Sequence, residues 1–527
     1  MNKVQNIVVA VVAVFFFKCS VAQTPKKPNI ICIVADDLGY SDIGCYGGEI
    51  KTPSLDKLAS EGLRLKNMHN GSMCVLSRSM LLSGKWAPKA GNGIKLGTKT
   101  LADELKNVGY RTGIVGKWHL QGEPNNRGFD YFFGFLGGFS SYYNGSKDYR
   151  LNQIPFTNFG KDYYSTDAFT EKAIEFIQPN NLDKNKPFFL YLSYQSPHNP
   201  LQAPKADIMK YRGKYLAGWQ ATRDKRIKKQ LELGIIKEGQ ALPAYPQNLP
   251  DWSSLSPEQR DLEDLRMSVY AAMVEKMDSG IGKLMESLKK TGQLENTVIL
   301  FLSDNGSDSF SAADAAMIQK GLLPGDPESN YQPGTGWAYA NATPWRLYKI
   351  SQHSGGVKTG AIIWYPKQIK DRGAIKTNAL HVVDIMPTIM ELATGEKLKL
   401  ENLSGESFLP LISGKQLKRK NPMFFQFVDN RAIRTDQWSM VEVDGNGWEL
   451  YKNSDEMETN DVVKQFPNVV SDLNKTWMNW WKTEGNHTIY EPVSTATGPH
   501  YKPQGDRGTG KKYIPTAMPL ELSKKYK

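Results

Sequence analysis

The segments Asn29-Ile-Ile-Cys-Ile-Val-Ala-Asp36-Asp37 and Thr297-Val-Ile-Leu-Phe-Leu-Ser-Asp304-Asn305-Gly306 lie far apart in the chain and decide its fold. Unbroken apolar runs of this length, rich in β-branched residues, are typical of buried parallel strands. Each run ends in side chains that carry carboxylate or amide oxygens. Because ligands of open α/β sheets bind at the carboxyl ends of the strands, we expect these oxygens to meet at one sheet edge. Such hard donors suit Ca²⁺ or Mg²⁺ better than zinc.

Strands and helices alternate along most of the chain. The other predicted strands are Arg111–Val115, Phe188–Ser193 and Gly360–Tyr365. Helical spacing and capping signals predict helices at Ser54–Leu63, Cys74–Leu82, Thr100–Val108, Leu262–Lys290 and Val382–Leu392. The alternation predicts an α/β fold with a large, mostly parallel sheet flanked by helices.

The length of 527 residues predicts more than one domain, since single cores stop growing near about 250–300 residues. From about residue 421, short segments separated by turn signals predict a small antiparallel sheet. We expect a catalytic domain over residues 23–420 and a smaller C-terminal antiparallel-sheet α+β subdomain over 421–492. Residues 493–527 are rich in Lys, Gly and Pro, which indicates a tail that wraps around the protein or is disordered.

Residues 1–22 have the features of a signal peptide. Lys3 supplies a positive start, Ile7–Phe17 is apolar, and Ser20-Val21-Ala22 is a cleavage site of small residues. The apolar stretch of about 11 residues is shorter than the roughly 20 that span a bilayer, so no transmembrane anchor is expected. We therefore expect a periplasmic or secreted protein.

The formal net charge of +12 favours polyanionic partners through long-range attraction. The Lys and Arg residues are scattered along the chain, so nucleic acid is not an expected partner. Cleavage of the signal peptide would leave Cys32, Cys45 and Cys74, an odd number without paired spacing. A disulfide framework is therefore not expected.

Cys74-Val75-Leu76-Ser77-Arg78 stands at the start of a predicted helix. Free N–H groups at a helix N-terminus and a cation one turn further on together favour an oxyanion. A lone cysteine near a helix start is more often just a small residue. Together with the acidic strand ends, however, this segment indicates chemistry on an anionic ester.

The chain resembles the formylglycine-dependent sulfatases of the alkaline-phosphatase-like superfamily, to about residue 465. The motifs that carry the resemblance are Asp36-Asp37-Leu38-Gly39, Cys74-Val75-Leu76-Ser77-Arg78, Gly116-Lys117-Trp118-His119, Arg127-Gly128-Phe129-Asp130, Ser196-Pro197-His198, Ser303-Asp304-Asn305-Gly306 and Thr343-Pro344-Trp345-Arg346-Leu347-Tyr348-Lys349. One position departs from the family pattern. Leu76 stands where the enzymes that convert the cysteine to formylglycine usually read Pro or Ala, so conversion of Cys74 stays open.

The resemblance implies the roles of the site residues. Cys74, as formylglycine, would be the nucleophile, and one divalent cation, most simply Ca²⁺ with Mg²⁺ as the other choice, would be held by Asp36, Asp37, Cys74, Asp304 and Asn305. Arg78, Lys117 and Lys349 would clamp the sulfate. His119 would accept the proton of the nucleophile, His198 would protonate the leaving group, and His353 would contact substrate.

The implied activity is hydrolysis of sulfate esters, on a sulfated carbohydrate or an aryl sulfate, after modification by a formylglycine-forming enzyme. Trp219, Trp345, Tyr348 and the aromatic residues within 135–143 are candidates for stacking on sugar rings. Two alternatives stay open. One is a phosphonate or phosphodiester monoester hydrolase of the same superfamily, and the other is an unmodified glycan-binding homologue with little catalytic activity.

Overall fold

The computed structural model describes residues 26–526, except 92, 179–185, 312, 397–402, 429, 443–446 and 486–512. The predicted signal peptide and residues 493–512 of the predicted tail lie outside the described residues. No helix in the described part of the chain is long and apolar enough to cross a bilayer.

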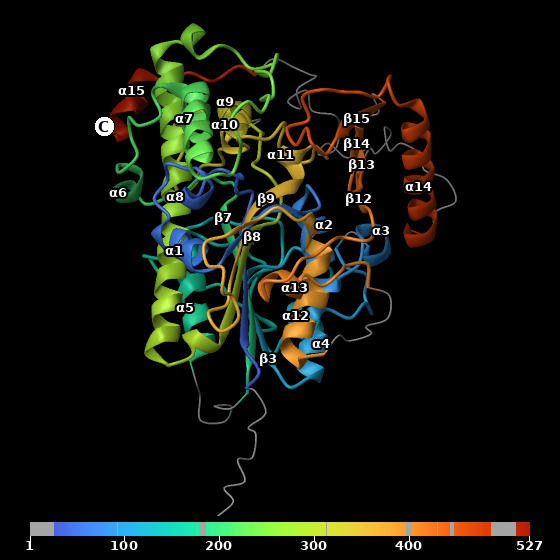
Figure 1. The fold of residues 1–527 in the computed structure, drawn as a ribbon. Helices are drawn as coiled ribbons and strands as arrows, with labels where there is room; N and C mark the ends of the chain where they lie inside the picture. The colour runs from blue at the N-terminus through green and yellow to red at the C-terminus, as the bar shows by residue number, and fades with distance from the viewer. Residues whose placement is uncertain are drawn as a thin grey trace, which may run out of the picture.

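Strand β1 (Asn29–Asp36) lies near the middle of a large sheet (Figure 1). It pairs in parallel with β7 (Phe188–Pro197) and β8 (Thr297–Ser303), and β3 (Arg111–Lys117) is parallel to β7. The strand order is β10-β2-β9-β8-β1-β7-β3-β4-β5-β6, with β11 paired to β2. The other strands are β2 (Leu63–His69), β4 (Tyr131–Phe135), β5 (Tyr149–Leu151), β6 (Ile154–Pro155), β9 (Lys358–Trp364), β10 (Ile375–Lys376) and β11 (Leu380–His381).

The sheet is mixed. The strand predicted at Gly360–Tyr365 is present as β9, but it runs antiparallel to both β8 and β2. The segment between β8 and β9 stays at the carboxyl edge of β8, where the Lys349 N–H donates to the Ser307 carbonyl at 3.2 Å. Strand β9 therefore starts at that edge and runs back across the sheet.

Helices cover both faces of this sheet (Figure 1). One face carries α1 (Pro53–Glu61), α5 (Ser165–Ile177) and α8 (Pro257–Lys290), and the other carries α2 (Cys74–Ser83), α4 (Leu101–Asn107) and α12 (Ile385–Thr394). Along β1, Ile31 and Ile33 belong to one core, whereas Ile30, Cys32 and Val34 belong to the other. Burial on both faces explains why the sequence of β1 is an unbroken apolar run. The other α-helices before residue 413 are α3 (Ala87–Ala90), α6 (Lys205–Ile208), α7 (Gly218–Glu232), α9 (Asp314–Gln319), α10 (Gly334–Asn341), α11 (Ser354–Val357) and α13 (Leu409–Ile412).

A second sheet, of four antiparallel strands, follows in the C-terminal part of the chain. Its strands are β12 (Met423–Phe427), β13 (Asn430–Arg434), β14 (Trp438–Glu442) and β15 (Trp448–Lys452), and α14 (Pro467–Gly485) lies beside it (Figure 1). The end of the described chain, with α15 (Leu520–Ser523), packs on the large domain. The Tyr513 hydroxyl donates to Glu263 of α8 at 2.9 Å, and the Tyr526 hydroxyl donates to Asp326 at 2.9 Å.

Helix α1, which connects β1 to β2, is anchored from a distant helix. Its own N-cap residue, Thr52, makes no side-chain cap. Instead, the carboxylate of Asp278 on α8 accepts the N–H groups of Ser54 at 3.0 Å and Leu55 at 2.8 Å. These two bonds satisfy helix donors that otherwise have no partner within the helix.

We predict that Asp278→Ala lowers the free energy of unfolding by about 1–2 kcal/mol, because the start of α1 loses its cap. Glu286→Ala is the matched control, since Glu286 lies on the same helix with 62% of its side chain exposed and pairs only with Lys290. Urea unfolding followed by circular dichroism would measure both variants. Equal midpoints for Asp278→Ala and Glu286→Ala would contradict this role of Asp278.

Candidate active site

Four parallel strands deliver polar side chains to one edge of the large sheet. Because β1, β3, β7 and β8 run in the same direction, their carboxyl ends lie side by side. The side chains at or just beyond these ends are Asp36 and Asp37 after β1, Lys117 at the end of β3, His198 after β7, and Asp304 and Asn305 after β8. The predicted convergence of Asp36 and Asp37 with Asp304 and Asn305 is present: Asn305 Nδ2 donates to Asp37 Oδ1 at 2.5 Å.

Three carboxylates at this edge are each paired with a buried cation. Lys117 Nζ lies 2.7 Å from Asp36 Oδ2, and Lys349 Nζ lies 2.7 Å from Asp37 Oδ2. Arg78 Nε donates to Asp304 Oδ2 at 2.9 Å. An ammonium has three N–H donors, so each lysine can hold its carboxylate and an anionic group at the same time.

A close approach between two loops brings Lys349 to the site. The Gly306 N–H donates to the Gly356 carbonyl at 3.1 Å. A Cβ atom on Gly306 would lie 2.0 Å from the Gly355 carbonyl oxygen, so only glycine permits this contact. The turn that carries Asp304 and the loop that carries Lys349 are thereby held together.

Cys74 is the first residue of α2, as predicted, and its N-cap residue provides no side-chain cap. Its Sγ atom lies 3.3 Å from His119 Nδ1. Burial raises the pKa of the Cys74 thiol, although Lys117 opposes the shift, so the unmodified residue is not poised as a thiolate. If Cys74 is converted to formylglycine, Sγ marks the position that an oxygen of the modified side chain would take.

Both histidines of the site are neutral at ordinary pH. Burial, followed by Lys117, lowers the pKa of His119 to about 2. Burial also lowers the pKa of His198 to about 3, with Asp37 opposing the shift. His198 Nδ1 lies 2.7 Å from the Asn199 carbonyl, which assigns the ring proton to Nδ1 and leaves Nε2, 3.6 Å from Asp37 Oδ2, as an acceptor.

The pKa values of Asp37 and Asp304 differ because the two carboxyl groups have different neighbours. Burial alone would raise the pKa of Asp37, but Lys349 and His198 outweigh it and lower the pKa to about 2. Burial and the adjacent Asp36 raise the pKa of Asp304 to about 6, despite Arg78. A bound cation would relieve the electrostatic repulsion between Asp304 and the neighbouring carboxylates.

The site fits a divalent cation. Asp36 Oδ1 and Asn305 Oδ1 are buried oxygens without a hydrogen-bond partner among the described residues. Ligand atoms of Asp36, Asp37 and His198 lie within 4.8 Å of one another. Buried oxygens without partners are unfavourable unless a ligand satisfies them, and oxygen donors suit Ca²⁺ or Mg²⁺. His198 was not among the metal ligands predicted from the sequence.

Arg78 and His353 each contact neighbouring protein groups, and their contacts with substrate stay predictions. Arg78 donates to Asp304, Ser193 and the Lys117 carbonyl, which hold its guanidinium group at the site. His353 Nε2 lies 2.6 Å from Glu449 Oε2, and its Nδ1 lies 3.1 Å from Ser351 Oγ. With its side chain 1% exposed, His353 braces the Lys349 loop against β15.

Sequence reasoning missed Asp308, Ser193 and Glu449. Asp308 is buried beside the site, and its pKa is raised to about 6 by burial and by Asp37, although Lys349 opposes the shift. Its position four residues after Asp304 was the available signal. Nothing in the local sequence of Ser193 or Glu449 marks them, because each contacts the site from a separate element.

Most of the aromatic side chains predicted to stack on sugar rings are buried. Trp219, Trp345 and Tyr348 are at most 2% exposed and belong to the core, so they are not free to stack on a sugar. Phe139, from the predicted 135–143 cluster, is 55% exposed and its ring lies parallel to that of His198, with 6.3 Å between ring centroids. Phe139 is therefore an exposed aromatic side chain beside His198.

Comparisons with known proteins agree with this geometry. The family model described as Sulfatase matches residues 28–395, and the model described as N-sulphoglucosamine sulphohydrolase, C-terminal, matches residues 347–482. An uncharacterized sulfatase of Schizosaccharomyces pombe is 34% identical over 86% of this chain and 93% of its own length, and an arylsulfatase of Klebsiella aerogenes is 33% identical over 74% and 91%.

Among solved structures, Ps i-CgsB in complex with k-i-k-neocarrahexaose has a TM-score of 0.67 and 26% identity, with 89% of this chain and 96% of that chain covered. The Sulfatase family model covers most of the chain. The relatives have a similar length, and the solved structure shares the fold. The chain belongs to the sulfatase family and is a sulfuric ester hydrolase.

Proposed function

We propose that this sulfatase hydrolyses sulfate esters of sugars, using a formylglycine made from Cys74 and one divalent cation, most simply Ca²⁺. The observation that carries the proposal is the position of Cys74 beside His119, at a sheet edge that also holds three buried carboxylates and the cations of Lys117 and Lys349. The features of residues 1–22 support action in the periplasm or outside the cell.

A sugar substrate is favoured over a simple aryl sulfate by three observations. The C-terminal family model carries the name of a sugar sulphohydrolase, and the structure of Ps i-CgsB holds a carrahexaose. Beside His198, exposed Phe139 offers an apolar ring on which a sugar ring could stack. Asp36, Asp37, Asp304 and Asn305 would hold the cation, with His198 Nε2 within reach, and the cation would supply Lewis-acid stabilisation of sulfate oxygens.

The protein side chains divide the remaining work. Formylglycine at position 74 would add water to form a gem-diol, and one of its hydroxyl oxygens would attack sulfur while the bond from sulfur to the sugar oxygen breaks. His119 Nδ1 lies 3.3 Å from Cys74 Sγ, where it can accept the proton of the second hydroxyl, so that the aldehyde forms again and sulfate leaves. Lys117 and Lys349 would bind the sulfate oxygens while they keep their bonds to Asp36 and Asp37. The departing sugar oxygen needs a proton, because its alkoxide is a poor leaving group. His198 is the candidate donor once its Nε2 has taken up a proton.

We predict that protein co-produced with a formylglycine-forming enzyme releases sulfate from at least one member of a panel of defined sugar sulfates. Mass spectrometry of the peptide that contains residue 74 should show a mass lower than that of cysteine by the difference between sulfur and oxygen plus two hydrogens. Cys74→Ala should abolish sulfate release, because the nucleophile is gone. A modified peptide with sulfate release only from aryl sulfates would refute the sugar substrate, and an unmodified but fully active enzyme would refute formylglycine.

We predict that chelation stops sulfate release and that Ca²⁺ restores it. Adding Ca²⁺ at 100 times its dissociation constant should raise the free energy of unfolding by about 2.7 kcal/mol, since the ion binds only the folded protein. Asp36→Asn should weaken both effects, whereas Asp371→Asn, with its side chain 40% exposed on the surface, should change neither. Full activity in protein shown by elemental analysis to contain no metal would exclude the cation.

We predict that His198→Ala lowers kcat on sugar sulfates by about 10²–10⁴-fold, the usual contribution of a general acid. The loss on activated aryl sulfates should be much smaller, because a phenolate leaves without a proton. Comparing kcat for the two substrate types in the same preparation measures the difference. Equal losses would instead assign His198 to holding the cation with Asp36 and Asp37.

A further inference from the structure

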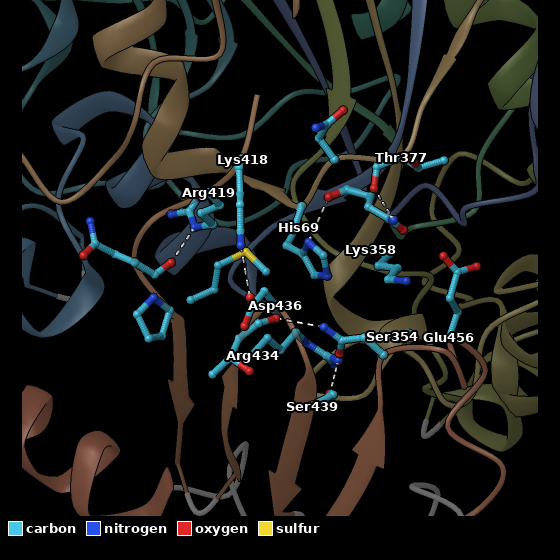
Figure 2. A pocket seen from close by; sticks show the side chains of 18 of the residues that line it. His69, Ser354, Lys358, Thr377, Lys418, Arg419, Arg434, Asp436, Ser439 and Glu456 are labelled. Atoms are coloured by element: carbon cyan, nitrogen blue, oxygen red, sulfur yellow. Dashed lines mark hydrogen bonds and ion pairs between the residues drawn. The ribbon is translucent and has the colours of Figure 1, made fainter. Parts of the chain in front are cut away.

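A cavity of about 950 Å³ lies between the edge of the large sheet and the C-terminal sheet (Figure 2). None of the active-site residues described above lines it. Its walls come from the ends of β2 and β9, from the segment 417–423, and from β13 and β14. Its volume is in the range of small-molecule binding sites.

The acidic side chains of this cavity already have partners. Glu456 Oε2 pairs with Lys66 Nζ at 2.6 Å, and Glu458 Oε1 pairs with Arg434 Nη2 at 2.9 Å. Asp436 pairs with Lys418 at 3.6 Å, and Figure 2 shows both side chains, each of which is exposed. The fourth acid of the lining, Asp455, accepts the N–H groups of Thr459 at 2.9 Å and Asn460 at 2.8 Å, so each acid of the cavity has a partner among the described residues.

Lys358, by contrast, has no ion-pair or hydrogen-bond partner for its amine among the described residues, and its contact is with an aromatic ring. The residue is 6% exposed, and its Nζ lies 3.8 Å from the centre of the Trp345 ring. Within the described chain, no hydrogen-bond acceptor or ion-pair partner contacts this amine, whose side chain lines the cavity between His69 and Glu456 in Figure 2. Burial lowers the pKa of Lys358 to about 7, with Glu456 opposing the shift. A buried ammonium without a counter-ion is unfavourable, and an anionic ligand would compensate it.

The remaining lining suits a molecule with many hydroxyl groups. Neutral hydroxyl and amide side chains surround the cavity: Asn67, Thr377, Asn378, Asn421, Thr435 and Asn453. His69 Nδ1 lies 3.0 Å from the Leu380 carbonyl, which places the ring proton there and leaves Nε2 as an acceptor. Such groups both donate and accept hydrogen bonds, as sugar hydroxyls require.

We propose that this cavity binds a monosaccharide that carries one carboxylate or one sulfate, with its anionic group at the Lys358 amine and its hydroxyls on the amide and hydroxyl lining. The site lies apart from the candidate active site, because none of the active-site residues lines it. The proposed role is binding, and it is independent of the proposed reaction.

Isothermal titration calorimetry with glucuronate, glucose 6-sulfate, inorganic sulfate and uncharged glucose tests the proposal. The protein would be the full chain with Lys349→Met, which removes a sulfate-binding cation from the active site. We expect one-site binding of at least one sugar anion, and no binding of glucose. Binding of glucuronate alone would indicate a carboxylate site, and binding of glucose 6-sulfate alone would indicate a sulfate site. Binding of both would indicate a site that recognises the negative charge of either group.

Adding Lys358→Met should weaken this binding at least about tenfold, because the ammonium group proposed to bind the anion is lost. Methionine keeps the unbranched chain that packs on Trp345. Lys418→Met is the matched control, since that side chain is 83% exposed at the rim, and it should change affinity by less than about twofold. Binding that survives Lys358→Met, or absence of binding at millimolar sugar anion, would overturn the proposal.

A labelling experiment on the unsubstituted protein covers the case in which Lys358→Met does not fold. Acetic anhydride modifies lysines that are uncharged and reachable, and mass spectrometry reports each site. The bound sugar anion should slow acetylation of Lys358 severalfold and leave Lys418 unchanged. Equal acetylation of Lys358 with and without the sugar anion would also refute the site.

Discussion

Three buried ion pairs at the carboxyl edge of the large sheet constrain everything else in this sulfatase. Asp36 pairs with Lys117, Asp37 with Lys349, and Asp304 with Arg78, and each partner comes from a different element. Burying one such charge alone is unfavourable by several kcal/mol, so the pairs form only when strands, helix and loops are all in register. The same pairs keep charged groups ready for an anionic substrate in a site without bulk water.

The C-terminal sheet contributes to this constraint without supplying the chemistry. Arg434 on β13 donates to the Gln352 carbonyl at 2.8 Å, and Glu458 accepts the Ser354 N–H at 2.8 Å. Together with the bond between Glu449 and His353, these contacts hold the loop that carries Lys349. The small sheet therefore acts as a brace for one cation of the site, and it also closes the cavity around Lys358.

Much of the candidate site was predictable from short motifs. The acidic ends of β1 and β8, the start of α2 at Cys74 and the strand end at Lys117 are local features, and their convergence follows from parallel strand order. The direction of β9 was not predictable, because the same apolar pattern fits a strand of either direction. The contacts of Arg78 and His353 depend on partners remote in sequence, and the burial of Trp219, Trp345 and Tyr348 depends on the packing of the whole core.

The sequence by itself determined the residue types of the site, the strands that carry them and the family, since these depend on periodicity and on motifs a few residues long. The tertiary structure alone decided which charges are paired, which histidine nitrogen carries the proton, and that the Lys358 amine has no ion pair among the described residues. Those outcomes depend on distances between elements hundreds of residues apart. Because these groups are buried, few water molecules remain to replace a missing partner, so each of these distances affects the stability of the site.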